Sequence, residues 1–169
     1  IYLVPTDGKG GAKNLTTDNV RGDDEPRFAP DGKSLLFVRQ VLPAAPGSGE
    51  SQKLWRHTFA DGRTTPVTAQ IDLSIGGIAF SDPAGALWLQ AEEQGRVPVF
   101  AVDAKGAGLA KVVAEGSNTA LDSANGRLVF LNENNSRAAE LFTLDPGSSQ
   151  PRQLTHFNDA LFATFDLGK

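Results

Sequence analysis

Cysteine and methionine are both absent from the 169-residue sequence, and histidine occurs only twice. Without cysteine, the chain has no disulfide, no thiol nucleophile and no thiolate-bound metal. No apolar run reaches the roughly 18 residues that a membrane-spanning helix needs, so no membrane partner is predicted. Because there is no methionine and Ile1 falls inside an apolar strand-like run, we expect the chain to belong to a longer polypeptide.

Positive charge is also in short supply. The 16 Lys and Arg residues are outnumbered by 20 Asp and Glu residues, which gives a net charge of −4 and a pI near 5.1. Nucleic-acid binding favours a basic surface, so a nucleic-acid partner is not expected. No motif for a cofactor is present, and none is predicted.

What the chain does contain is a repeated strand unit. The clearest copy joins Pro26–Val38 to Lys53–Thr68, and reads as apolar strand, Asp-Gly turn, apolar strand, loop, aromatic strand, Asp-Gly turn and short strand. The residues that close successive copies fall at steps of 52, 45 and 42 residues, at Thr16, Thr68, Val113 and Thr155. A four-strand unit that recurs at this period is typical of a β-propeller blade.

The turns and the apolar runs support strands throughout. Four dipeptides that close hairpins recur along the chain, at Asp7-Gly8, Asp31-Gly32, Asp61-Gly62 and Asn125-Gly126. Three runs are apolar at every position, as in strands covered on both faces, at 35–38, 86–89 and 128–131. No window has a helical period, so almost no helix is expected.

The predicted fold is all-β: a partial β-propeller of about three and a half four-stranded antiparallel blades. The expected parts are a half blade at 1–16, blades at about 26–68, 75–113 and 117–155, and a final strand at 160–167. A stretch at 43–51 lacks apolar periodicity and is predicted to be a flexible inserted loop. Because stand-alone propellers usually have about four to eight blades, this part is expected to be a fragment of a propeller, or a module that closes by pairing with another chain.

Catalytic candidates are few. His57 lies in an aromatic strand, where we expect it to face outward or to pack at a blade edge, and His156 follows a closing threonine. Either could orient a serine, but a structural or surface role is favoured. The segment Asp72–Gly76 has the rhythm of a nucleophile elbow but lacks its first glycine, so it is interpreted as a loop between blades. No catalytic residue and no substrate-binding residue is assigned.

Two acidic clusters could bind ligands. The first could hold calcium through crowded carboxylates, but it lacks the EF-hand spacing, and turn caps and bonds to backbone amides are favoured; its members are Asp18, Asp23, Asp24 and Glu25. The second, Glu92-Glu93, could capture the free amine of a peptide, although solvated charge beside a turn is the simpler interpretation. No metal site is predicted.

Aromatic residues recur at matching places in the repeats, and their period favours core packing over a ligand platform. They are Tyr2, Trp55, Trp88, Phe100 and Phe142.

Together these residues resemble a known family. The segments Ile1–Gly8, Lys13–Thr16 and Pro26–Lys33 are similar to the propeller of prolyl-oligopeptidase family serine peptidases, of the bacterial acylaminoacyl-peptidase and dipeptidyl-peptidase type. The more specific part is the ending, Ser136–Leu144 followed by Arg152–Asn158, which resembles the last blade of those enzymes. The resemblance implies that residues 1–169 are the C-terminal part of a propeller domain. The Pro-Asp-Gly repeat is also shared with propeller proteins of the Tol system.

The resemblance implies a partner and a substrate. In the family, an α/β-hydrolase domain follows the last blade and carries the Ser, Asp and His, so none of them falls within this chain. The chain is therefore predicted to be an inactive, substrate-gating fragment of a peptidase that cleaves short peptides, with the hydrolase domain as its partner. Two alternatives stay open: a Tol-like protein-binding scaffold without an enzyme, and self-association through open blade edges.

Overall fold

The hairpin turns form where the sequence places them. Gly8, Gly32, Gly62 and Gly126 have φ values of 70°, 66°, 67° and 72°, the left-handed region in which glycine is favoured. At the last turn Asn125 also has a positive φ of 52°, so both central residues suit a type I′ hairpin, whose twist matches that of the strands.

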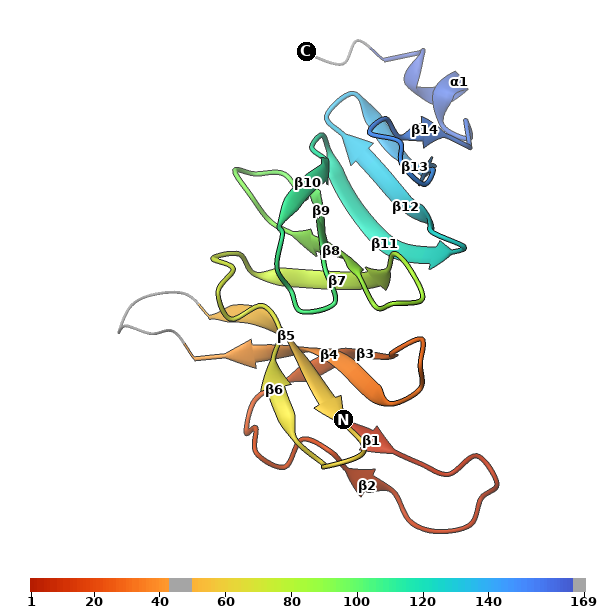
Figure 1. Ribbon diagram of the computed structural model, residues 1–169. Coiled ribbons are helices and arrows are strands. Elements are labelled where there is room, and N and C mark those ends of the chain that lie inside the picture. The colour runs from red at the N-terminus through yellow and green to blue at the C-terminus, as the bar shows by residue number, and fades with distance from the viewer. Residues whose placement is uncertain (43–49, 166–169) are drawn as a thin grey trace. The chain divides into compact units, whose positions relative to one another are not determined.

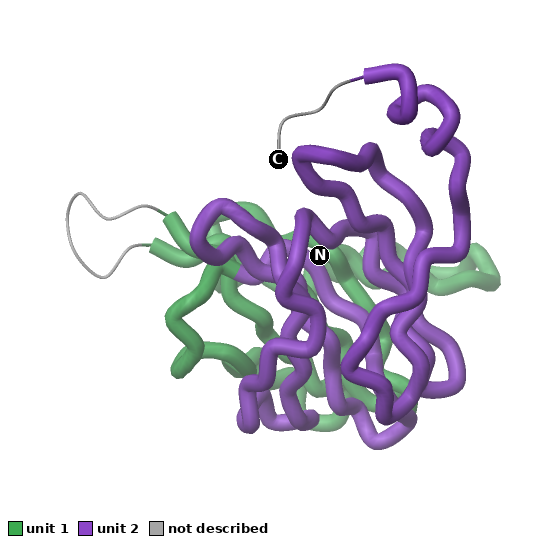
Figure 2. Tube along the Cα trace, turned by 90° about the horizontal axis from the view of Figure 1, so that it is seen from above, with its two compact units in different colours: residues 1–74 green, residues 75–169 purple. Residues whose placement is uncertain are grey.

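The computed structural model describes residues 1–42 and 50–165 of the chain, which divides into two compact units (Figures 1 and 2). The first unit is residues 1–74 and the second is residues 75–169.

The first unit contains two antiparallel sheets. β1 (Tyr2–Leu3) pairs with β2 (Lys13–Asn14) in a two-stranded sheet. The other sheet has four strands in sequence order, β3 (Asp23–Phe28), β4 (Ser34–Val41), β5 (Ser51–Thr58) and β6 (Thr64–Pro66).

The second unit contains two four-stranded antiparallel sheets. One is formed by β7 (Ile75–Phe80), β8 (Leu87–Ala91), β9 (Val99–Val102) and β10 (Ala110–Val113). The other is formed by β11 (Ser117–Ala124), β12 (Arg127–Asn134), β13 (Arg137–Leu144) and β14 (Arg152–Gln153).

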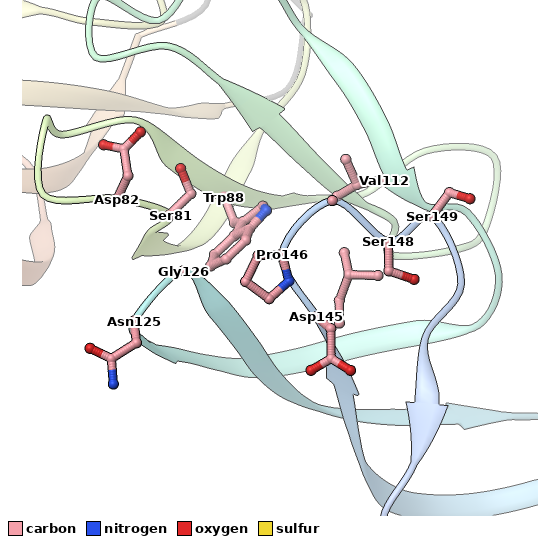
Figure 3. Close-up of a pocket in the computed structure, with 12 residues that line it drawn as sticks. Ser81, Asp82, Trp88, Val112, Asn125, Gly126, Asp145, Pro146, Ser148 and Ser149 are labelled. Atoms are coloured by element: carbon pink, nitrogen blue, oxygen red, sulfur yellow. The ribbon is translucent and has the colours of Figure 1, made fainter.

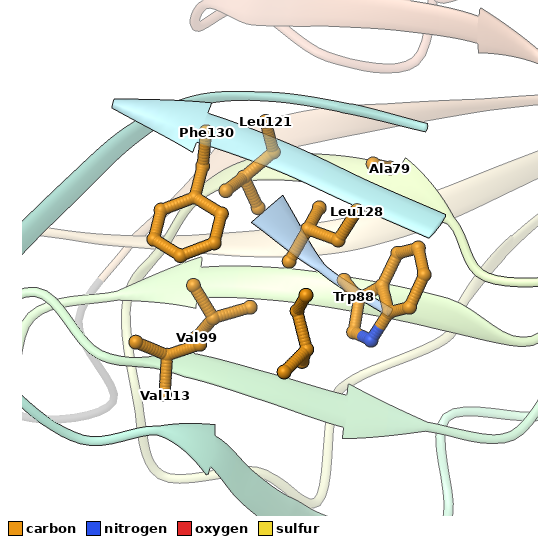
Figure 4. Close-up of a cluster of buried hydrophobic side chains, with 8 residues drawn as sticks. Ala79, Trp88, Val99, Val113, Leu121, Leu128 and Phe130 are labelled. Atoms are coloured by element: carbon orange, nitrogen blue, oxygen red, sulfur yellow. The ribbon is translucent and has the colours of Figure 1, made fainter. Parts of the chain in front are cut away.

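The core of the second unit lies between its two sheets (Figure 4). Each sheet contributes four buried side chains: Ala79, Trp88, Val99 and Val113 from one, and Leu121, Leu128, Phe130 and Leu144 from the other. The apolar run at 35–38 of the first unit is equally buried, with no residue more than 4% exposed. Two sheets that pack face to face through apolar side chains are the blade packing that the sequence predicts.

The end of the described chain departs from expectation. The strand predicted at 160–167 is wrong, because a short helix, α1 (Asp159–Phe162), occupies its start and a turn continues to residue 165. A strand needs a neighbour for its backbone bonds, whereas here the amides of Phe162 and Ala163 bond to the carbonyls of Asn158 and Asp159. Residues 166 and 167 lie outside the described residues.

The rest of the architecture agrees with an all-β partial propeller of three four-stranded sheets and one two-stranded sheet. The inserted loop predicted at 43–51 falls mostly on residues 43–49, which lie outside the described residues, and Ser51 already belongs to β5. Within 1–42 and 50–165, no helix combines the length and the apolar character needed to cross a bilayer.

Candidate functional site

A cation lies over the aromatic ring of the third strand in each four-stranded sheet. The Arg39 guanidinium is 4.7 Å from the Trp55 ring, the Lys111 ammonium is 5.6 Å from Phe100, and the Arg137 guanidinium is 4.6 Å from Phe142. Each ring thus contacts a cation of its own sheet, which agrees with the packing role expected for these aromatics.

The other two aromatics differ from each other. Trp88 is 7% exposed and belongs to the core of the second unit, whereas Tyr2 is 66% exposed. Core packing was expected at both positions, and the structure does not bear it out for Tyr2.

His57 is buried and packs at the edge of its sheet. Its Nδ1 lies 2.9 Å from the Oγ1 of Thr64 on the edge strand β6, and its ring contacts Phe59 edge-on. The packed-edge alternative is therefore correct and the outward-facing one is wrong. The hydroxyl beside this imidazole belongs to a threonine that is tied into the ladder between β5 and β6.

His156 is exposed beside α1. Its Nδ1 lies 2.8 Å from Asp159 Oδ2 and 3.3 Å from Gln153 Nε2. A carboxylate that orients an imidazole is half of a catalytic triad, but a nucleophile must complete it. In the described part of the chain, neither histidine has a hydrogen bond to a serine hydroxyl.

The elbow-like segment forms no elbow. Asp72 to Ser74 lie in the connection between β6 and β7, and Ile75 and Gly76 begin β7. The Ser74 Oγ accepts a hydrogen bond of 3.0 Å from the backbone N–H of Gln52. This hydroxyl thus serves as an acceptor for the backbone of β5.

Two members of the first acidic cluster, Asp18 and Asp23, bind the side chain of Arg39, whereas Glu25 forms an ion pair of 3.6 Å with Arg27. Arg39 donates from Nε to Asp23 Oδ1 at 2.8 Å, and from Nη1 and Nη2 to Asp18 at 2.9 and 3.0 Å. Hydrogen bonding to the Arg39 guanidinium lowers the pKa of the Asp18 carboxyl, against the opposing effect of its partial burial. The turn caps expected for these two residues are thus replaced by an ion pair. Nowhere in residues 1–42 and 50–165 do three Asp, Glu or His side chains gather as ligands for a metal.

The second acidic cluster is divided. Glu93 forms an ion pair with Lys111, and its backbone bridges to that of Arg96 across the turn between β8 and β9. Glu92 is exposed. One of the two carboxylates proposed for amine capture is therefore already neutralised by a lysine.

A hollow of about 540 Å³ opens at the hairpin turns of the second unit (Figure 3). Trp88, Val112, Leu144 and Pro146 give it an apolar lining, and its edges carry hydroxyls and carboxylates from the turns. No histidine is among the residues that line it. It can hold an apolar group, but it contains no pair of nucleophile and base.

A second hollow, of about 590 Å³, lies at the opposite ends of the same strands and is polar. Arg96 and Glu115 line it and form an ion pair of 3.4 Å. Glu133 and Asn134, the last two residues of β12, line it as well.

The wall of this polar hollow is held by two buried amides that the sequence analysis missed. Asn118 Nδ2 donates to the carbonyls of Val97 and Glu115 at 2.8 and 3.1 Å, and Asn132 Nδ2 donates to Glu115 O and to Asn118 Oδ1 at 3.0 and 2.7 Å. These bonds join the ends of β11 and β12 to the backbone at Val97 and Glu115, beside the hollow. An Asn in a strand carries no sequence signal for this role.

Glu140 is the other missed residue. It is 1% exposed in β13, and its carboxylate accepts hydrogen bonds from the Thr155 hydroxyl and from the backbone and side chain of Asn158, the latter two at 2.8 and 3.0 Å. The Thr155 bond is the main cause that lowers the pKa of Glu140, and burial opposes it. A lone carboxylate inside an apolar strand is the signal that could have found it.

Comparison with known proteins finds similarity in structure but not in sequence. Neither a protein-family model nor a curated protein matches the sequence. Solved propellers do match the structure. An acylaminoacyl peptidase of Pyrococcus horikoshii matches 80% of this chain and 20% of its own, with 22% identity and a TM-score of 0.60.

Two further solved structures that match are the propeller domain of a protease and a TolB protein. The β-propeller domain of the trilobed protease from Pyrococcus furiosus matches 79% of this chain and 38% of its own, with 24% identity and a TM-score of 0.59. TolB from Acinetobacter baumannii matches 92% of this chain and 37% of its own, with 16% identity and a TM-score of 0.72.

These likenesses show the β-propeller fold, and the chain spans only about a fifth to two fifths of the proteins it resembles. The resemblance to the propellers of prolyl-oligopeptidase family peptidases is confirmed at the level of the fold. The Tol-system propellers share that fold.

Proposed function

We propose that this chain is part of the propeller of a serine peptidase that cleaves short peptides, and that it gates access of substrate to a catalytic domain elsewhere in the parent polypeptide. The observation that carries the proposal is the set of hydrogen-bond partners of the two histidines. His57 is hydrogen-bonded to Thr64, and His156 to Asp159 and Gln153, and among the described residues neither has a hydrogen bond to a serine. A chain with this fold and no nucleophile-base pair would contribute walls to an active site, while the reacting groups come from an α/β-hydrolase domain.

The sequence of the last blade supports this assignment. Ser136–Leu144 includes β13, and Arg152–Asn158 includes β14 and the segment that Glu140 holds. Both resemble the final blade of the peptidases. Gating has a physical use there, because a covered site excludes water and orders a short substrate, whereas a folded protein is too wide to enter.

The experiment compares residues 1–169 with the whole parent polypeptide. Both are treated with a fluorophosphonate probe that labels activated serines, and both are assayed with acylaminoacyl and dipeptidyl anilides. We expect no labelling and no turnover by residues 1–169, and labelling of one serine outside them in the parent. Turnover by residues 1–169 that the probe abolishes would refute the proposal, as would a parent that has no labelled serine.

Gating is tested separately on the parent. Peptides of increasing length with the same N-terminal residues are supplied as substrates, and kcat/KM is measured for each. We expect a steep fall in kcat/KM with length. A parent that cleaves long and short peptides equally well would keep its peptidase assignment and lose the gate.

A second candidate is a protein-binding scaffold of the Tol type. It is favoured by the match to TolB, which has a higher TM-score and a greater coverage of this chain than the peptidases have. It predicts a parent without a reactive serine, so the fluorophosphonate experiment separates the two candidates.

A further inference from the structure

Trp88 carries a hydrogen-bond donor that no described residue satisfies. It lies in β8, paired with Ala79 of β7 and Ala101 of β9, and only 7% of its surface is exposed. Within residues 1–42 and 50–165, its indole nitrogen has no acceptor. Because an N–H without a partner is unfavourable in a buried side chain, this donor needs an acceptor from outside the chain.

The two tryptophans of the chain differ in what their nitrogens face. The Nε1 of Trp55 is buried and has no partner, whereas the Nε1 of Trp88 is not among the fully covered atoms. Trp88 borders the hollow of about 540 Å³, and Figure 3 shows its indole nitrogen on the side of the ring that faces Val112 and Pro146. This nitrogen therefore opens into the hollow, while the rest of the ring packs in the core.

The hollow is built from two complete sheets. Val112 comes from β10 and Leu144 from β13, each in a sheet of four strands. Gly126, in the turn between β11 and β12, lies against the turn after β7, because a Cβ there would be 3.5 Å from Ser81 O and 3.5 Å from Pro146 Cγ. The walls belong to the interior of the second unit and do not depend on where the chain begins or ends.

The size and the lining suit a small apolar group. Cavities of about 300–1,000 Å³ with apolar walls and a few polar groups are typical of ligand sites. The apolar walls are Val112, Leu144 and Pro146, and the indole N–H of Trp88 is held in a set direction because its ring is part of the core. An occupant must therefore supply an apolar group with a hydrogen-bond acceptor beside it.

The charges at the rim favour a neutral acceptor. Asp82 and Asp145 line the hollow, and none of the described lining residues is Lys, Arg or His. Asp145 is paired with Arg127 at 2.6 Å, but Asp82 is exposed, and its Oδ1 accepts a bond of 3.1 Å from the Ala86 N–H. A carboxylate or a phosphate would meet a like charge here, whereas a carbonyl oxygen would not.

We propose that this hollow binds one apolar residue of an extended peptide segment from another polypeptide. The side chain of that residue fills the apolar part, and a backbone carbonyl beside it accepts the hydrogen bond of Trp88 Nε1. Every apolar residue of a peptide offers these two groups together, and tryptophan suits such contacts because its ring is apolar and its N–H is a donor. The proposal rests on the hollow and does not depend on the peptidase assignment.

The test uses the ¹⁵N-labelled chain of residues 1–169, whose two tryptophans give two indole N–H signals. Trp88→Phe identifies the signal of Trp88, and the buried N–H of Trp55, in the other unit, is the internal reference. The probe is acetyl-Gly-Leu-Gly-amide, a capped peptide without charge. We expect a saturable downfield shift of the Trp88 indole proton, as for an N–H that gains a carbonyl acceptor, with a Kd of about 1 mM and no shift of Trp55.

Two companion peptides separate the apolar contact from the effect of charge. Acetyl-Gly-Gly-Gly-amide keeps the carbonyls and should bind at least about tenfold more weakly, because it has no side chain to bury. Acetyl-Glu-Leu-Glu-amide keeps the leucine and should bind severalfold more weakly at low salt, because its carboxylates approach Asp82. Asp82→Asn should narrow that last difference, since it removes the charge and keeps the oxygen that accepts from Ala86.

Two matched substitutions locate the binding. Ser149 lines the hollow, is exposed, and has no side-chain hydrogen bond within the described part of the chain. Ser149→Phe should therefore fill the hollow without disturbing the fold, and should abolish the shift of Trp88. Ser136→Phe makes the same change at an exposed serine in the turn between β12 and β13, at the other end of the sheet, and should leave the affinity unchanged.

Three outcomes would overturn the proposal. One is the absence of any Trp88 shift up to about 30 mM acetyl-Gly-Leu-Gly-amide, which would leave water as the partner of the indole. Another is an equal affinity for the peptide without leucine, which would mean that the hollow does not bind the apolar side chain. The third is an equal loss of affinity in the Ser149→Phe and Ser136→Phe chains, which would place the peptide elsewhere.

Discussion

Arg39 and Asp23 meet in the interior of the first unit, with the guanidinium Nε 2.8 Å from Asp23 Oδ1 and neither side chain more than 6% exposed. The remaining nitrogens of Arg39 bond to Asp18, whose side chain is 54% exposed, and the guanidinium plane lies over Trp55. β3 and β4 are joined through this pair as well as through their ladder. Each of these buried charges depends on the other, because burial of either one without its partner would be unfavourable in free energy.

Replacement of the arginine should therefore destabilise the first unit strongly. Arg39→Met leaves the Asp23 carboxylate buried without its cation, and we expect a loss of about 3–5 kcal/mol in the free energy of unfolding. Asp18→Asn removes only the exposed partner, with an expected loss of about 1 kcal/mol or less. Urea denaturation followed by tryptophan fluorescence measures both.

Arg63→Met is the matched control, since Arg63 is exposed on a turn, and its effect should lie within about 0.5 kcal/mol. If Arg39→Met proved no worse than Arg63→Met, the buried pair would contribute nothing to the fold.

A second prediction concerns Gly116, in the connection between β10 and β11. Its φ is +79°, and a Cβ placed there would lie 2.5 Å from Glu133 O and 2.7 Å from Asn132 Nδ2. Gly116→Ala should destabilise the second unit by more than about 3 kcal/mol, because the clash with backbone adds to the strain of the left-handed conformation. It should also disturb the Asn118–Asn132 bonds that hold the polar hollow.

Gly147→Ala separates the two causes. Gly147 has nearly the same φ, +75°, but a Cβ there would meet nothing within 4 Å. Only the conformational cost remains, about 1 kcal/mol. Thermal unfolding of the two variants side by side gives the comparison, and equal losses would mean that the close approach at Gly116 carries no cost.

The features that could be predicted from the sequence are those that neighbouring residues determine, namely the turns and the buried apolar strands. Asp-Gly and Asn-Gly pairs accept positive φ, so the turn at Gly32 could be placed from two residues. The apolar run Leu35–Val38 is buried, as its unbroken apolar pattern predicts. Strand order and fold class follow from the repetition of these signals.

Long-range polar contacts could not be predicted in the same way. The partner of Asp23 is 16 residues away, and that of Glu140 is 18 residues away at Asn158. Nothing in the local pattern says which cation or amide a carboxylate will meet. The strand predicted at 160–167 failed for a related reason, because an apolar segment without a neighbouring strand closes its bonds locally as a helix.

The last prediction concerns how the stability contributed by the Glu140 carboxylate depends on pH. Its hydrogen bonds to Thr155 and Asn158 hold the segment between β14 and α1 against β13. These bonds favour the ionised form, so the pKa of Glu140 in the folded chain lies below its ordinary value of 4.5. The stabilisation is complete at a pH above 4.5, and it is lost as the pH falls from there through the lowered pKa of the folded state, because the unfolded chain then binds the proton first.

Glu140→Gln tests this directly. The glutamine amide has one oxygen in place of two, so one of the present donors loses its acceptor or meets the amide NH₂ group. The Tm at pH 7 should therefore fall by several degrees, on the order of 4 °C.

Other carboxylates also titrate in acid, and the informative quantity is therefore the difference in Tm between Glu140→Gln and the unaltered chain. That difference should shrink as the pH falls below 4.5, and the Asn158 amide resonance should shift over the same range. Glu133→Gln, at an exposed position, should show neither effect. A Tm difference that stays constant from pH 7 to acid would mean that the charge on Glu140 does not hold this segment, and that only the shape of the side chain matters.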